Sequence, residues 1–228
     1  MHQDEQMLAA SRRLTEALRP GDLDATLAQL THAAVDVLPD VEYASMTIKH
    51  ADGRLETVAP TSPFILDLDA AQYTLREGPC YEAATETVHV TAPHIASDPR
   101  FPRYSREAVS RGVEAQAGIR LFDTTASSGA LNLYAVKPGA FEDLGSIGDL
   151  FTHHAAVALA YAREVTQLQE AVQTRQLIGR AVGVTMERFG LDEARAFGFL
   201  SRLSQDTNTK LRVVAERLLD ETASALPD

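Results

Sequence analysis

Two kinds of hydrophobic spacing occur along this chain of 228 residues. In residues 3–18 and 24–38 apolar side chains recur every three or four positions, which predicts two amphipathic helices. Between residues 41 and 137 apolar and polar side chains alternate instead, and this period of two is typical of β-strands. Strands are expected over residues 41–50, 54–60, 87–91, 114–123 and 128–137.

Helices and turns are predicted between these strands. Residues 64–75 and 101–112 have helical spacing, and Asp52-Gly53 is a typical hairpin turn between the first two strands. The order is helices, a hairpin, a helix and then further strands. This order predicts an α+β fold, in which helices flank an antiparallel sheet.

From Leu144 the apolar residues follow a heptad spacing that no proline interrupts. The seam consists of Leu144, Ile147, Phe151, His154, Ala158, Tyr161, Val165, Leu168 and Val172. A straight helix over residues 144–189 would be about 69 Å long, which is too long for one small domain. We therefore expect a coiled-coil helix that leaves the sheet domain and pairs with a second copy of the chain.

The next seam positions are Arg175 and Gly179, so the apolar stripe moves to neighbouring positions there. Gly179 and Gly183 lie inside the expected helix, where each glycine costs roughly 0.5–1 kcal/mol relative to alanine. We interpret the small residues here as allowing the later helices to pack tightly or an RNA to approach the backbone. The segment is then a junction, and a possible hinge, between the coiled coil and a C-terminal unit.

Two shorter helices are predicted after Gly190. Asp192 is a candidate N-cap of the first helix, and a break at Asn208 separates it from the second. With the end of the long helix they form a three-helix unit.

The charge distribution separates this last part from the rest of the chain. The net charge of −11 argues against general nucleic-acid binding. From Glu170 onward, however, eight basic residues nearly balance nine acidic ones. The basic residues lie mostly off the apolar stripes, which indicates either a surface that contacts phosphates or a solvated helical face. They are Arg175, Arg180, Arg188, Arg195, Arg202, Lys210, Arg212 and Arg217.

No pattern in the sequence indicates an enzyme, a metal site or a membrane span. Neither a phosphate-binding glycine loop nor an HEXXH motif is found, and a single cysteine forms no internal disulfide or zinc cluster. No apolar run reaches the length of a membrane helix, and the N-terminus is unlike a signal peptide. We therefore expect a cytoplasmic protein without catalytic or metal-binding residues.

Cys80 and the histidines leave a second interpretation open. Cys80 follows a Gly-Pro break and could begin a helix, where a thiol pKa is lowered, or it could be a small buried hydrophobe. His153 and His154 would point about 100° apart on a helix, which makes them poor co-ligands. A haem or redox sensor that uses Cys80 or a histidine is therefore an alternative function.

Residues 177–219 resemble the ANTAR domain, a three-helix RNA-binding module of bacterial antitermination regulators. The resemblance rests on the A-x-G stretch of residues 181–183, on the LSQ of residues 203–205 and on the N-x-K-L of residues 208–211. It also rests on Arg175, Ile178, Met186, Ala194, Phe197, Val214 and Ala215. Relatives usually carry a lysine where this chain has Val182, which puts one RNA contact in doubt.

The preceding part is similar to a GAF domain of the kind found before ANTAR in actinobacterial regulators. REGPCYEA at residues 76–83, residues 97–113 and residues 128–143 carry this similarity. The hydrophobic spacing and the two resemblances together predict an N-terminal helix (1–23), a GAF-like sensor domain (24–163), a connecting coiled-coil helix (164–189) and an ANTAR-like domain (170–228).

The resemblance implies a homodimer that binds a pair of RNA hairpins in a nascent transcript, with a small molecule or a partner sensed by the GAF-like domain. The ligand, its binding residues and any cofactor are unknown from the sequence. The expected RNA-binding residues are Arg175, Arg180, Arg188, Asn208, Thr209, Lys210 and Arg212. The alternative is an interaction scaffold whose helical tail only dimerises.

Overall fold

The computed structural model of this chain describes residue 12 and residues 22–224. They form two compact units, of which the first ends at Arg163 and the second begins at Glu164. The helix predicted at residues 3–18, and nearly all of the region 1–23, lie outside the described residues.

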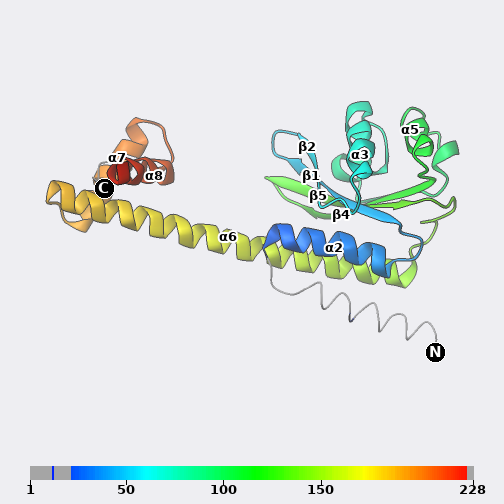
Figure 1. The fold of residues 1–228 in the computed structure, drawn as a ribbon, viewed down its shortest axis with the longest axis horizontal. Coiled ribbons are helices and arrows are strands. Elements are labelled where there is room, and N and C mark those ends of the chain that lie inside the picture. The colour runs from blue at the N-terminus through cyan, green and yellow to red at the C-terminus, as the bar shows by residue number, and fades with distance from the viewer. Residues whose placement is uncertain (1–11, 13–21, 225–228) are drawn as a thin grey trace. The chain divides into compact units, whose positions relative to one another are not determined.

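The first unit contains a five-stranded antiparallel sheet with the order β2-β1-β5-β4-β3 (Figure 1). Its strands are β1 (Tyr43–His50), β2 (Leu55–Val58), β3 (His89–Ala92), β4 (Ala115–Asp123) and β5 (Ser127–Ala135). Each strand begins and ends within two residues of its predicted bounds. The predicted α+β class with an antiparallel sheet is therefore confirmed.

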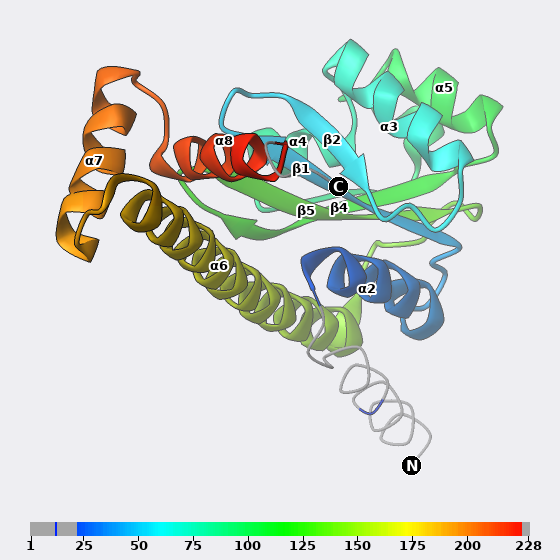
Figure 2. The same ribbon diagram turned by 60° about the vertical axis from the view of Figure 1, so that its left-hand side comes forward.

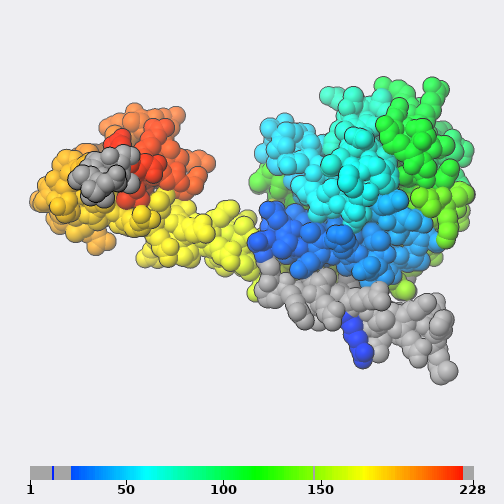
Figure 3. Space-filling view, in the orientation of Figure 1, coloured from blue at the N-terminus to red at the C-terminus, as the bar shows by residue number. Residues whose placement is uncertain are grey.

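Helices cover both faces of this sheet (Figure 2). On one face lie α2 (Leu23–Val37) and the first part of α6 (Gly145–Phe189), around a core that includes Leu30, Met46 and Phe151. On the other face lie α3 (Phe64–Leu75), α4 (Pro79–Thr85) and α5 (Tyr104–Ser110). In the space-filling view α2 is blue and α3 is cyan (Figure 3).

Capping and turn residues explain why these helices begin where they do. The Asp22 carboxylate accepts a hydrogen bond of 2.8 Å from the backbone N–H of Ala25 at the start of α2. Gly78 has a φ of +121°, which only glycine adopts readily, and Pro79 then opens α4. The helix start suggested near Cys80 is thus confirmed, although its seven residues are too few to show a helical period.

The heptad seam of α6 has two different environments. Phe151 and Ala158 are buried in the core of the first unit, whereas Tyr161, Leu168 and Val172 are 53%, 60% and 56% exposed. The first half of the seam therefore packs in the core of the first unit, and only its second half is open to a second copy. The helix is continuous through Gly179 and Gly183.

The second unit consists of the end of α6 with α7 (Glu193–Asp206) and α8 (Leu211–Ser224). Asp192 caps α7 through a 2.8 Å hydrogen bond from the Arg195 N–H, as predicted. The core comprises six buried residues: Ala181, Val182, Ala196, Leu200, Val214 and Ala215. Among the described residues, no helix has the length and apolar character needed to cross a membrane.

Candidate nucleic-acid interface and a buried polar network

All of the expected RNA-binding residues lie in the second unit, and nearly all are exposed. Arg175, Arg180 and Arg188 project from the exposed surface of α6. Asn208, Thr209 and Lys210 form the connection between α7 and α8, with Thr209 partly buried, and Arg212 lies in the first turn of α8. At about 100° per residue, Arg175 and Arg180 lie about 140° apart around the helix, so the α6 arginines do not form one stripe.

Hydrogen bonds fix the connection between α7 and α8. Asn208 has a φ of +47°, and the Ser204 hydroxyl donates a 2.6 Å hydrogen bond to the carbonyl of Thr209. The Thr209 hydroxyl in turn donates to the Thr207 carbonyl at 3.1 Å. The loop therefore presents Lys210 from a defined backbone rather than from a free segment.

Several cations of this unit have no acidic partner. Arg212 pairs with Glu216 at 3.0 Å and Arg195 with Asp192 at 3.5 Å. Within the part of the chain that the structure describes, no ion pair involves Arg175, Arg180, Arg188 or Lys210. Their charges are therefore available to an anion, and no carboxylate need be displaced.

A groove of about 810 Å³ runs between α6 and α7. It is lined by Arg175, Ile178, Gly179, Val182, Gly183, Met186, Asp192, Glu193, Ala194 and Phe197. Val182 is only 6% exposed, so a lysine at this position would have to extend its ammonium group out of the core to reach an RNA.

The glycines of this groove are not explained by packing within the chain. A Cβ atom built on Gly179 or Gly183 would meet no atom within 4 Å outside the adjacent backbone of its own helix. Tight packing of the later helices therefore does not explain the two glycines, whereas Ala181 between them is fully buried against α7 and α8, as that interpretation expects. The other interpretation, that the glycines leave room for another molecule to approach the backbone of α6, remains.

The first unit contains a buried polar network between the sheet and α3. At its centre the Asp69 carboxylate accepts hydrogen bonds of 2.9 Å from the hydroxyls of Ser45 and Thr57. It also accepts one from the Tyr134 hydroxyl and one of 3.3 Å from the Gln72 amide. Burial raises the pKa of Asp69 to about 6, and hydrogen bonds from Tyr134, Ser45 and Thr57 limit the rise.

Two further parts of the network bear on function. The Asn132 amide donates to Ser45 at 2.9 Å and to Thr47 at 2.8 Å, while its buried Oδ1 has no partner among the described residues. The Cys80 thiol is fully buried and accepts a 2.7 Å hydrogen bond from Gln116. Burial raises the pKa of Cys80, so the thiol remains protonated, as expected for the small buried hydrophobe rather than for a reactive cysteine.

Sequence reasoning missed this network, although part of its signal was present. Ser45 and Thr47 in β1, and Asn132 and Tyr134 in β5, share one face of each strand and are polar. Polar residues on that face indicate either solvent or a polar layer. Asp69, on a helix more than twenty residues away, gives no sign that it completes the layer.

The rings of His153 and His154 lie 5.9 Å apart in an edge-to-face arrangement. His89 is exposed, and His94 lies 3.2 Å from Glu142. His154 contacts the Leu150 carbonyl at 3.0 Å through Nδ1. Among the described residues, no group of three or more His, Cys, Asp and Glu side chains is placed to hold a metal ion.

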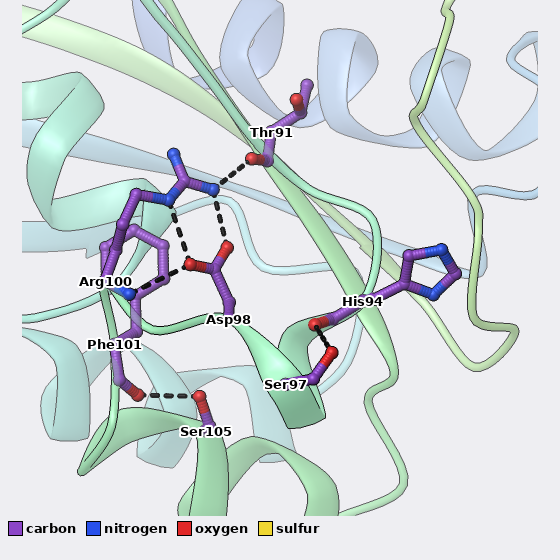
Figure 4. A network of polar contacts seen from close by, with 7 residues as sticks. All are labelled: Thr91, His94, Ser97, Asp98, Arg100, Phe101 and Ser105. Atoms are coloured by element: carbon purple, nitrogen blue, oxygen red, sulfur yellow. Dashed lines mark hydrogen bonds and ion pairs between the residues drawn. The ribbon is translucent and has the colours of Figure 1, made fainter.

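A surface ion pair near His94 holds the segment between β3 and α5 (Figure 4). Arg100 donates to both carboxylate oxygens of Asp98, at 3.0 and 2.6 Å, and to the Thr91 carbonyl at 2.5 Å. The hydrogen bonds from Arg100 lower the pKa of Asp98. Two of the three guanidinium nitrogens of Arg100 and both Asp98 carboxylate oxygens are engaged with the chain itself, so the pair is a structural clamp.

The first unit has the fold of GAF domains. It is similar to the GAF domain of a phosphoenolpyruvate-protein phosphotransferase from Coxiella burnetii, with a TM-score of 0.53, 17% identity, and coverage of 70% of this chain and 96% of that chain. A free methionine-R-sulfoxide reductase from Neisseria meningitidis is also similar, with a TM-score of 0.52, 13% identity, and coverage of 68% and 89%. At these identities the likeness shows the fold alone.

The second unit is similar in sequence to a known family. Residues 166–219 match the model of the ANTAR domain. Over 100 residues the chain is 32% identical to the transcriptional regulatory protein PdtaR of Mycobacterium tuberculosis. These residues make up 44% of this chain and 48% of that protein. The chain thus spans about half the length of the curated relatives it matches. A unit with the fold of GAF domains is thus followed by a segment that matches the ANTAR domain, as the resemblance predicted.

Proposed function

We propose that this chain is an RNA-binding transcription antitermination regulator that works as a homodimer in the cytoplasm. The ANTAR domain binds a pair of hairpins in a nascent transcript, and the GAF-like domain senses a small molecule or a partner. The observation that carries the proposal is the ANTAR match at residues 166–219, together with the similarity to a transcriptional regulatory protein.

The unpaired cations of the second unit support the RNA contact. Arg175, Arg180, Arg188 and Lys210 bind phosphates in this proposal, and Arg212 does so by exchanging its bond to Glu216. Asn208 and Thr209, on the ordered loop beside Lys210, contact the loop bases. Arg180 replaces the usual lysine contact from another side of the helix, because Val182 lies about 200° away from it.

The exposed half of the α6 seam supports the homodimer. Val165, Leu168 and Val172 occupy the a, d and a positions of the heptad, and Leu168 and Val172 are more than half exposed. Valine at a with leucine at d favours two parallel strands. A second copy would remove this apolar stripe from water.

The buried network supports a sensing role for the first unit. A ligand that enters the layer between the sheet and α3 can donate a hydrogen bond to Asn132 Oδ1, which has no partner there among the described residues. Binding of the ligand would rearrange the hydrogen bonds around Asp69. The ligand can shift the conformation of the dimer only if it binds one conformation more tightly than the other.

The experiment is a binding titration of the full chain with a dual-hairpin RNA at two salt concentrations. Arg180→Ala and Lys210→Ala are expected to weaken binding, and each lost phosphate contact should lower the salt slope by about one. Arg106→Ala is the matched control, because Arg106 is exposed on α5 without an ion pair among the described residues. A folded dimer that binds no RNA, with or without candidate ligands, would favour the scaffold alternative.

A further inference from the structure

The exposed seam of α6 and the groove of the second unit lie on one line of the helix. At about 100° per residue, Tyr161, Leu168 and Val172 fall within about 20° of Gly179 around the helix axis. All three are more than half exposed. An apolar stripe that faces solvent along α6 therefore leads directly to the two glycines of the groove.

The heptad also continues into the groove without a change of phase. The four seam positions after Val172 are Arg175, Gly179, Val182 and Met186, and all four line the groove. The shift of the apolar stripe at residue 175 therefore adds a second face to the helix, which packs on α7 and α8. Val182 belongs to that packed core, whereas Arg175 and Gly179 on the original face remain exposed.

The glycines give this accessible face its shape. Gly179 and Gly183 lower the helical propensity of α6, yet no atom outside the adjacent helix backbone lies within 4 Å of where their Cβ atoms would be. Across the groove Phe197 of α7 is 48% exposed. The surface is therefore a notch in a helix beside an exposed aromatic ring, which fits another helix in close approach.

We propose that a second copy of this chain occupies the groove. The two α6 helices pair in parallel from Tyr161 through Met186, Gly179 faces its counterpart, and Phe197 packs on the α6 of the other copy. The alternation of Val165, Leu168 and Val172 supports the parallel register. Arg175, the charged seam residue, keeps its aliphatic part in the seam and its guanidinium in water. This inference rests on the proposed homodimer, but not on RNA binding.

Disulfide crosslinking of the full chain tests the inference. Gly179→Cys places a thiol at the proposed contact, Leu168→Cys marks the coiled coil, and Arg180→Cys is the control about 100° away on the same helix. The unsubstituted chain controls for Cys80, which is fully buried. Under mild oxidation, crosslinking at residue 179 is expected within about threefold of the rate at residue 168 and at least about tenfold faster than at residue 180.

The other outcomes separate this inference from the function it builds on. If residue 168 crosslinks but residue 179 crosslinks no faster than residue 180, the homodimer is supported and the contact of a second copy with the groove is contradicted. Protection of Gly179→Cys from a maleimide by RNA would then identify RNA as the occupant. If neither residue crosslinks, both the homodimer and the groove contact fall. RNA binding by that same protein would show that the RNA-binding proposal survives alone.

Discussion

The two units of this chain place their polar side chains differently. In the first unit Asp69, Gln72, Asn132 and Tyr134 are fully buried and joined by hydrogen bonds between the sheet and its helices. In the second unit nearly all of the expected RNA-binding side chains are exposed over a core of only six buried residues. Buried polar groups are costly to leave without partners, whereas exposed ones are not. Substitutions of these polar side chains should therefore affect stability in the first unit and binding in the second.

The largest effect should come from the small core of the second unit. Leu200→Ala removes a fully buried side chain from α7 and should destabilise this unit by roughly 2–5 kcal/mol. Amide hydrogen exchange of the full chain should show lost protection in α7 and α8 with protection of β4 and β5 unchanged. Leu131→Ala in the first unit is the matched control and should have the reverse pattern. Loss of protection in both units from either substitution would show that they do not unfold separately.

The buried carboxylate should make the stability of the first unit depend on pH. Asp69 has a pKa raised from 3.8 to about 6, so between these values the folded chain holds a proton that the unfolded chain has released. The Asp69 contribution is therefore full below about pH 4 and falls by about 3 kcal/mol as the pH rises past about 6. Denaturant titrations of the chain and of Asp69→Asn should show a difference in unfolding free energy that changes over this window. A constant difference from pH 4 to 7 would contradict the burial argument.

A glycine substitution should stabilise the second unit. In the monomeric chain Gly183→Ala adds a methyl group that meets no atom within 4 Å outside the adjacent helix backbone, and it should raise the stability of α6 by roughly 0.5–1 kcal/mol. Hydrogen exchange in residues 176–189 measures the gain. Gly118→Ala is the contrasting variant, because its Cβ would lie 2.6 Å from the Pro79 carbonyl oxygen and should destabilise the first unit. A loss of stability in Gly183→Ala would mean that the groove is closed in the isolated chain.

The smallest effect on stability should accompany a loss of function. Lys210→Ala removes an exposed side chain that has no ion pair among the described residues, so the unfolding free energy should change by no more than about 0.5 kcal/mol. Thermal unfolding measures this change, and the RNA titration of the same sample measures the weaker binding. A large loss of stability would mean that Lys210 supports the loop rather than the RNA.

The sequence was informative where one element determines its own pattern. The strand alternation and the Asp192 cap depend on neighbouring residues, and both are confirmed. The network around Asp69 depends on Ser45, Thr57 and Tyr134, which meet only because the sheet order brings β1, β2 and β5 under α3. The groove depends equally on the crossing of α6 and α7. The positions of the basic residues off the apolar stripe of each helix predicted that their side chains are exposed. They did not predict which of these side chains lie close together on the folded unit.

The polar layer has a consequence for how the sheet assembles. In the β1–β5 pairing Ser45 lies opposite Asn132, and both face Asp69. A slip of one residue would reverse the faces of a strand, moving Ser45 toward Phe151 and Met46 toward the carboxylate. Such a misaligned sheet would bury hydroxyls in an aliphatic layer and strand a carboxylate among methyl groups. The network thus favours the native register of β1 and β5 during folding, since only this register satisfies its hydrogen bonds.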